Sequence, residues 1–126
     1  MIFWILACLG VYLVNIYSAG VLLMARIGPT AFMGPRDTLP EPGKHYARLQ
    51  KAASNFAESL PLFLTLALLV LVVEGVDKAL AEQGAMIFVL ARVAYIAVYV
   101  SGVPLIRSLV FVVGMTGLLL MGFSLF

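Results

Sequence analysis

Long apolar segments alternate with short polar ones along the chain. The apolar segments cover approximately residues 2–26, 44–74, 84–101 and 104–126. About 20 apolar residues in an α-helix cross the hydrocarbon core of a bilayer. The pattern therefore predicts an all-α fold, an integral membrane four-helix bundle that forms a single domain over residues 1–126.

The second apolar segment carries a stripe of polar positions. At about 100° per residue, Arg48, Lys51, Asn55 and Glu58 fall within about 80° of one another on a helix. An ionised carboxylate at the edge of lipid is costly and needs a partner. Pro61 follows within one turn, removes one backbone hydrogen bond and is expected to bend the helix.

The third segment carries a second stripe. Arg92, Tyr95 and Tyr99 share one face of a helix. A deep arginine is expensive unless it is paired, and Glu58 is the only carboxylate at comparable depth. We therefore expect the Glu58 and Arg92 faces to meet, within a subunit or across an interface. A purely structural ion pair that locks the bundle is the alternative to a ligand site.

The ends of the first and fourth segments add two more arginines. Arg26 closes the first segment. Arg107 and Ser108 lie in the first turn of the fourth, where the helix dipole disfavours a cation. Arg107 can snorkel to headgroups, but the dipole cost favours anion binding. Asn15, inside the first segment, is expected to make a helix–helix hydrogen bond.

Basic residues are distributed unevenly between the connections. The segment 27–43, rich in proline and glycine, is expected to be a connector. The basic residues of this connection and its flanks are Arg26, Arg36, Lys44, Arg48 and Lys51. Arg107 lies at the third connection, whereas the second has only Lys78. By the positive-inside rule, loops one and three face the cytoplasm.

Composition supports a membrane protein and excludes several function classes. Of the 126 residues, 63% are hydrophobic and 11% charged, and the mean hydropathy is +1.11. A soluble domain of this size could not bury so much apolar surface. The net charge of +2, without a basic tract, argues against nucleic acid.

The residue types needed for several common sites are missing from the sequence. Cys8 is the only cysteine and lies in the first apolar segment, so no intrachain disulfide can form and the thiol is expected to be buried. His45 is the only histidine, which leaves no metal cluster. No credible Ser-His-Asp set or glycine-rich phosphate loop appears.

The polar stripes together suit a small anion that also carries an amine. Cations would hold its carboxylates, and Glu58 could hold its ammonium group. Apolar walls beside such a site would accept a lipophilic second substrate from the bilayer.

The spacing of these residues resembles the MAPEG family, the membrane-associated proteins of eicosanoid and glutathione metabolism, which include microsomal glutathione transferases. The resemblance rests on Arg48-x-x-Lys51-x-x-x-Asn55-x-x-Glu58-x-x-Pro61-Leu62-Phe63, on Ala91-Arg92-x-x-Tyr95-x-x-x-Tyr99 and on Arg107-Ser108. It covers nearly the whole chain. The short loops resemble those of prokaryotic members, which implies a multi-pass protein of the bacterial inner membrane.

The resemblance implies a homotrimer with glutathione as co-substrate, bound between subunits near the cytoplasmic side. By similarity, the glutathione-binding residues are Arg26, Arg48, Lys51, Asn55, Glu58, Arg92, Tyr95 and Tyr99. Arg107 and Ser108 would be catalytic, near the sulfur. A free thiol has a pKa of about 8.5, so a nearby cation would favour the nucleophilic thiolate. The implied activity is a transferase or peroxidase that conjugates or reduces lipophilic electrophiles.

Two other functions remain open from the sequence. Lys51 stands where several family members carry arginine, and Ser54 departs from them too, which is compatible with a non-catalytic lipid-binding or scaffold member. A small four-span multidrug transporter, with Glu58 as its proton-coupled carboxylate, is the third hypothesis. Such transporters usually carry that glutamate in the first span, and cations around Glu58 would oppose its protonation.

Overall fold

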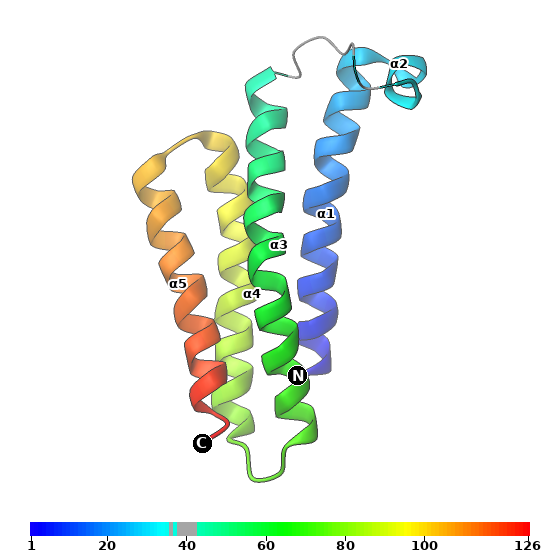
Figure 1. Ribbon diagram of the computed structural model, residues 1–126. Coiled ribbons are helices and arrows are strands. Elements are labelled where there is room, and N and C mark those ends of the chain that lie inside the picture. Colours follow the sequence, from blue (N-terminus) through cyan, green and yellow to red (C-terminus); the bar gives the residue numbers. More distant parts are fainter. Residues whose placement is uncertain (36, 38–42) are drawn as a thin grey trace.

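Long helices lying side by side form the protein, and the computed structural model describes residues 1–35, 37 and 43–126 (Figure 1). The helices are α1 (Ile2–Ile27), α2 (Pro29–Met33), α3 (Gly43–Val72), α4 (Lys78–Ser101) and α5 (Pro104–Phe123). All of them except α2 are long and apolar enough to cross a membrane. The chain is therefore an all-α, multi-pass membrane protein, as the apolar segments predicted.

One helix begins well before its apolar segment. α4 starts at Lys78, whereas the hydropathy pattern placed the third span at residues 84–101. The side chain of Asp77 accepts a hydrogen bond of 3.0 Å from the backbone N–H of Leu80. This N-cap satisfies one of the free donors of the first turn, so the polar residues there are helical as well. The proline in α3 does not end that helix, which continues past Pro61 to Val72.

The first connection contains a short helix that the sequence did not predict. Gly28 adopts a left-handed backbone with φ 86°, and Pro29 then occupies the first position of α2. A positive φ costs glycine little, and proline is preorganised for a helix start. Arg36, which contributed to the predicted charge asymmetry, lies outside the described residues.

Two glycines allow α4 and α5 to approach closely. A Cβ atom on Gly117 would lie 2.6 Å from the carbonyl oxygen of Gly84, and one on Gly84 would lie 2.6 Å from the carbonyl oxygen of Gly117. Small residues are a common means of helix contact in membranes, where apolar burial supplies little driving force. Gly122, by contrast, has no neighbour within 4 Å of such a Cβ.

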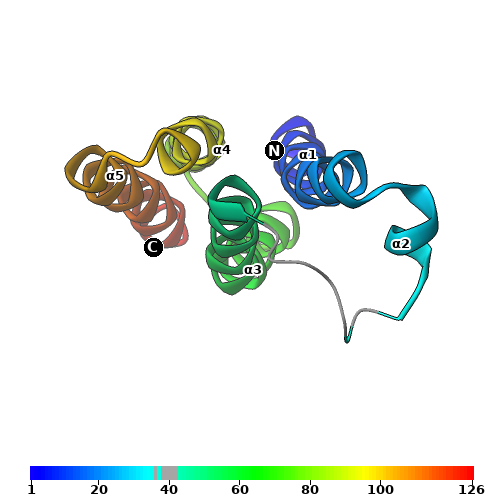
Figure 2. The same cartoon turned by 90° about the horizontal axis from the view of Figure 1, so that it is seen from above.

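An aromatic core joins α3 to α4 near the middle of the bundle. The rings of Phe63 and Phe88 are stacked with centroids 4.9 Å apart, and Phe56 meets Phe88 edge-on at 6.3 Å. Cys8 of α1 is fully buried against this cluster, as expected for a small apolar side chain. Viewed from above, α3 and α4 lie between α1 and α5 (Figure 2).

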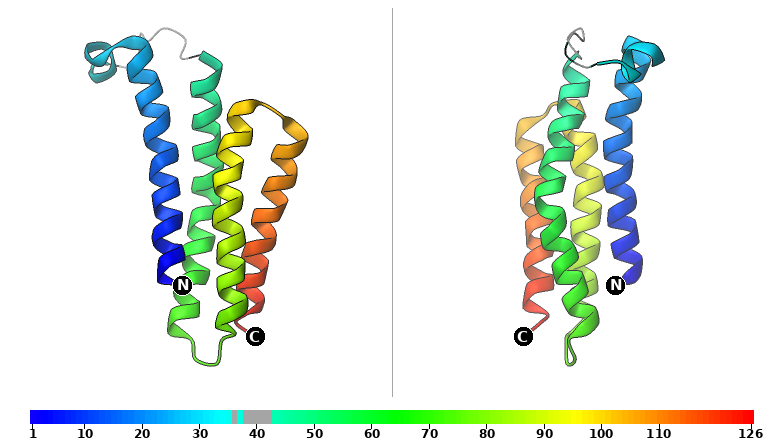
Figure 3. Two further views of the ribbon diagram at one scale, coloured as in Figure 1. Left: turned by 180° about the vertical axis from the view of Figure 1, so that it is seen from behind. Right: turned by 45° about the vertical axis from the view of Figure 1, so that its right-hand side comes forward.

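The basic ends of the helices lie together. Figure 3 shows that the end of α1, the start of α3 and the connection from α4 to α5 lie at one end of the bundle, whereas both termini lie at the other. The first and third connections therefore share a side, as the positive-inside argument required.

Candidate functional site

A polar furrow runs along the bundle where α3, α4 and α5 meet. It consists of three adjoining pockets of about 320, 240 and 180 Å³. Arg107 lines the first and second of these, and Asn55 lines the second and third, so each pocket borders the next. We call this the α3–α5 furrow, and its polar and aromatic lining is Lys44, Arg48, Lys51, Asn55, Glu58, Ser59, Tyr95, Tyr99, Arg107, Ser108 and Phe111.

The furrow changes character along its length. Its outer pocket, at the end of the bundle with the first and third connections, is lined by the basic side chains of Lys44, Arg48, Lys51 and Arg107. The inner pocket holds the exposed carboxylate of Glu58 among apolar and amide groups. The arrangement can therefore hold carboxylates at its outer end and a cationic group further in.

Arg107 lies at the centre of the furrow, above the end of α4. Its guanidinium carbon is 5.1 Å from the centroid of the Tyr99 ring, a cation–π contact. Tyr99 in turn lies 5.5 Å from the ring of Tyr95. The Ser108 hydroxyl donates to the carbonyl oxygen of Pro104 at 3.2 Å, and the side chain is exposed. Arg107 and Ser108 thus face the furrow together.

Arg92 has a different partner from the one expected within a subunit. Its side chain is 2% exposed, and Nη1 donates to Oδ1 of Asn55 at 2.8 Å. The guanidinium carbon also lies 5.0 Å from the centroid of the Phe88 ring and 5.6 Å from that of the Tyr95 ring. Asn55 stands one helical turn before Glu58 on the same stripe, and it meets Arg92 first.

The predicted Glu58–Arg92 ion pair is therefore absent from the single subunit. Among the described residues the one ion pair joins the amino group of Met1 to Glu82, at 2.6 Å. Two of the buried donors of Arg92, Nε and Nη2, have no hydrogen-bond partner in the described part of the chain. Arg92 is thus a buried group behind the furrow, in contact with Asn55.

Arg48 binds the C-terminal end of α4. Its Nη1 donates to the carbonyl oxygen of Val100 at 3.1 Å. The last carbonyls of a helix have no partner within it, so Arg48 supplies one from the neighbouring helix α3.

Arg26 lies outside the furrow. It is exposed at the end of α1, and its guanidinium lies over Gly43 at the start of α3. The predicted site residues therefore all line the furrow of the single subunit, except Arg26 and the buried Arg92.

Lys44 and Phe111 also line the furrow, although they were not among the predicted site residues. Both had a signal in the sequence. Lys44 falls four residues before Arg48 and continues the stripe, and Phe111 falls four residues after Arg107 on the same face of α5.

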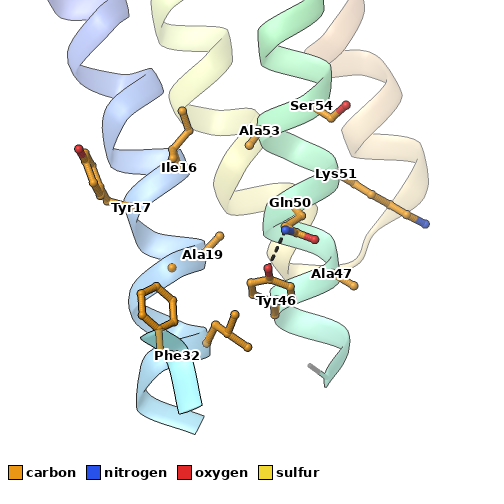
Figure 4. A pocket seen from close by; sticks show the side chains of 12 residues that line it. Ile16, Tyr17, Ala19, Phe32, Tyr46, Ala47, Gln50, Lys51, Ala53 and Ser54 are labelled. Carbon is orange, nitrogen blue, oxygen red and sulfur yellow. Dashed lines mark hydrogen bonds between the residues drawn. The ribbon is translucent and has the colours of Figure 1, made fainter. Parts of the chain in front are cut away.

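A second, larger pocket of about 730 Å³ lies between α1 and α3. Figure 4 shows Ala19 of α1, Phe32 of α2, and Tyr46 and Gln50 of α3 around it. The amide of Gln50 donates to the Tyr46 hydroxyl at 2.6 Å. Tyr17, Lys51 and Ser54 also contribute polar groups to a largely apolar wall. Sequence reasoning missed this pocket, because small residues on facing helices have no polar signal.

Asn15 does not make the expected helix–helix bond. Its amide is fully buried in α1, and neither Oδ1 nor Nδ2 has a partner among the described residues. The same part of the chain contains no cluster of metal-ligating side chains.

Comparison with known proteins identifies the family. The family model of the MAPEG family matches residues 1–126, the whole chain. No curated protein and no solved structure gave a match in the corresponding comparisons. The family match agrees with the four apolar helices and with the stripes that meet in the α3–α5 furrow. The chain belongs to the MAPEG family.

Proposed function

We propose that the protein is a membrane-bound, glutathione-dependent transferase or peroxidase acting on lipophilic electrophiles. The observation that carries the proposal is the α3–α5 furrow, in which basic side chains at the outer end lead past Arg107 to the exposed Glu58. Glutathione has two carboxylates, one ammonium group and one thiol. The furrow offers opposite charges for the first two kinds of group along one continuous surface.

In the proposed binding mode, Lys44 and Lys51 receive the carboxylates, and Glu58 receives the ammonium group. Asn55 and the phenols of Tyr95 and Tyr99 line the path between them. Arg92 holds Asn55 from behind. The proposed contacts to the carboxylates and to the ammonium group are charge-assisted hydrogen bonds, which are stronger than neutral ones.

In the proposed mechanism, Arg107 stabilises the thiolate of glutathione. It is partly buried, at the first turn of α5, where the helix dipole gives it no support. An anion beside it restores favourable electrostatics, so the thiolate is the form it binds best. The thiolate attacks an electrophile, or it displaces an alcohol from a hydroperoxide and forms a sulfenic acid that a second glutathione converts to the disulfide and water. Ser108 would contact the substrate beside it.

The quaternary structure completes the proposal. Glu58 is exposed on the single subunit at a depth where lipid would otherwise surround it, and an exposed carboxylate in lipid is costly. Arg26 lies apart from the furrow of its own subunit. A homotrimer in the bacterial inner membrane, with glutathione between subunits on the cytoplasmic side, would cover Glu58 and bring Arg26 of a neighbour to the site.

The test is a comparison of turnover and binding in the Arg107→Ala variant. The purified protein should conjugate glutathione to a generic electrophile such as chlorodinitrobenzene. Arg107→Ala should lower kcat by about 10²-fold, in the range of one lost electrostatic stabiliser, while glutathione still raises the melting temperature. Equal conjugation rates in the two proteins would remove Arg107 from the mechanism.

A second function, lipid binding without catalysis, is favoured by the α1–α3 pocket. That pocket is larger than any part of the furrow and largely apolar. A wild-type protein that glutathione fails to stabilise against heat would support this function. The transporter hypothesis loses support, because the family match over the whole chain is to the MAPEG family.

A further inference from the structure

The turn between α4 and α5 is held from outside by α3. Arg48, on α3, donates from Nη1 to the carbonyl oxygen of Val100 at 3.1 Å. Val100 belongs to the last turn of α4, whose carbonyls have no intrahelical partner. A cation at a helix C-terminus is also favoured by the helix dipole. The contact thus joins two residues 52 positions apart through a charge-assisted bond.

The same guanidinium lies directly against the turn. Gly102 is left-handed, with φ 82° and ψ 24°, and its N–H donates to the carbonyl oxygen of Val98 at 3.1 Å. A Cβ atom on Gly102 would lie 2.7 Å from both terminal nitrogens of Arg48. A side chain at this position is therefore opposed twice, by the backbone conformation and by the guanidinium.

Arg107 follows this turn immediately. α5 begins at Pro104, and the N–H of Arg107 donates to the carbonyl oxygen of Val103 at 3.2 Å. The Arg107 guanidinium lies 5.1 Å from the ring of Tyr99, in the last turn of α4. The position of the Arg107 guanidinium in the furrow therefore depends on the conformation of the turn that connects α4 to α5.

The end of α4 separates the start of α5 from the start of α3. Figures 1 and 2 both place the end of α4 between them. Arg48 and Arg107 nonetheless line the same outer pocket, together with Gly102. Arg48 is the side chain of α3 that reaches across to hold the turn.

We propose that Arg48 is a positioning residue, which clamps the α4–α5 turn and thereby sets the place of Arg107. This rests on the proposed function for its kinetic consequence, but the mechanical part stands on the contacts alone. A displacement of about 1 Å at a reacting group can cost about 10²-fold in rate. Loss of the clamp is therefore expected to lower kcat, whereas loss of a glutathione ligand would raise KM for glutathione.

The mechanical arm of the test uses a spin label on α5. Leu105, in the first turn, and Leu119, near the other end, are 71% and 61% exposed, and each can be replaced by cysteine and labelled. Cys8 is fully buried and is not expected to react. Arg48→Ala should increase the mobility of the label at position 105 and leave the one at 119 unchanged. Unchanged mobility at 105, or a rise at both positions, would overturn the proposal.

Three further variants keep the test decisive. Gly102→Ala should reproduce the rise at 105, since its Cβ displaces the Arg48 guanidinium. Arg48→Lys retains a cationic donor, so the label at 105 should be less mobile in it than in Arg48→Ala. It replaces Arg48→Ala in the test if that variant fails to fold. Lys51→Ala, which removes a cation from the same pocket, should leave the label at 105 unchanged.

The kinetic arm measures kcat and KM for glutathione in unlabelled Arg48→Ala. We expect kcat to fall by about tenfold or more, with KM changed by less than about twofold. A selective rise in KM would make Arg48 a ligand and overturn the proposal. If the wild-type protein has no glutathione-dependent activity, the proposed function fails, and the mobility of the label at 105 still decides the role of Arg48.

Discussion

At the scale of single residues, the protein accommodates a buried arginine without a buried carboxylate. Arg92 is held by one amide oxygen, from Asn55, and by surrounding aromatic faces. A cation–π contact is strongest where water is excluded, at about 2 kcal/mol or more. Burying a carboxylate beside Arg92 would add a second desolvation cost. Glu58 can therefore stay exposed in the furrow, available to a ligand or to a neighbouring subunit.

This arrangement predicts that Asn55 is important for stability as well as for binding. Asn55→Ala removes the one hydrogen-bond partner of Arg92 in the described part of the chain, and should lower the free energy of unfolding by about 2 kcal/mol. Ser54→Ala, an exposed neighbour on α3, is the matched control. Unfolding in mixed micelles measures both, and equal stabilities would show that the amide contributes little.

At the scale of helices, the periodicity of the sequence predicts which residues share a face of a helix. It does not predict the level along the bundle at which each residue meets the neighbouring helix. The stripes on α3 and α4 meet as expected because the face of a helix follows from spacing alone. Which residues of the two stripes make contact depends on how far each helix slides along its axis, and that is fixed by packing. Asn55 rather than Glu58 therefore reaches Arg92.

Other features of the helices were harder to predict from the sequence. The start of α4 depends on a side-chain cap from Asp77, which hydropathy does not detect. The close contact of α4 and α5 needs Gly84 and Gly117 but not Gly122. The sequence alone does not distinguish the three glycines. Which of them faces the neighbouring helix depends on the rotation of each helix about its own axis.

The glycine contact predicts a sharp contrast between two substitutions in α5. Gly117→Ala places a Cβ 2.6 Å from the Gly84 carbonyl oxygen and 2.8 Å from the Phe88 nitrogen. Since both are backbone atoms, the helices must separate, at a cost of about 1–3 kcal/mol. Gly122→Ala meets nothing within 4 Å and should be neutral or slightly stabilising. Thermal unfolding of both variants checks this, and equal losses would refute it.

At the scale of the whole molecule, the single subunit leaves a polar surface where lipid would lie. Lys51, Glu58 and Ser108 are all exposed along the furrow. Such a surface is costly in a bilayer unless protein, ligand or water covers it. The family resemblance predicted a subunit interface here, and the exposed polar surface of one subunit gives that prediction a physical reason.

The proposed homotrimer predicts contact between Glu58 and a neighbouring subunit. Native mass spectrometry from detergent should give three times the 13.6 kDa chain mass. Glu58→Arg places a cation where we propose that cations already gather, and should weaken the assembly through like-charge repulsion. Glu74→Arg, at the opposite end of the bundle, is the control. A monomeric wild-type protein would contradict the proposed arrangement.

The inner part of the furrow opens between apolar side chains, Leu62 and Val112, that are more than half exposed. Where the proposed trimer leaves these side chains uncovered, they face acyl chains, and under the proposed function a hydrophobic electrophile would arrive from the membrane. Its relevant concentration is then its mole fraction among the lipids. Extra lipid or detergent dilutes that mole fraction at constant bulk concentration. Rates for such a substrate are therefore comparable only between preparations with the same ratio of substrate to amphiphile.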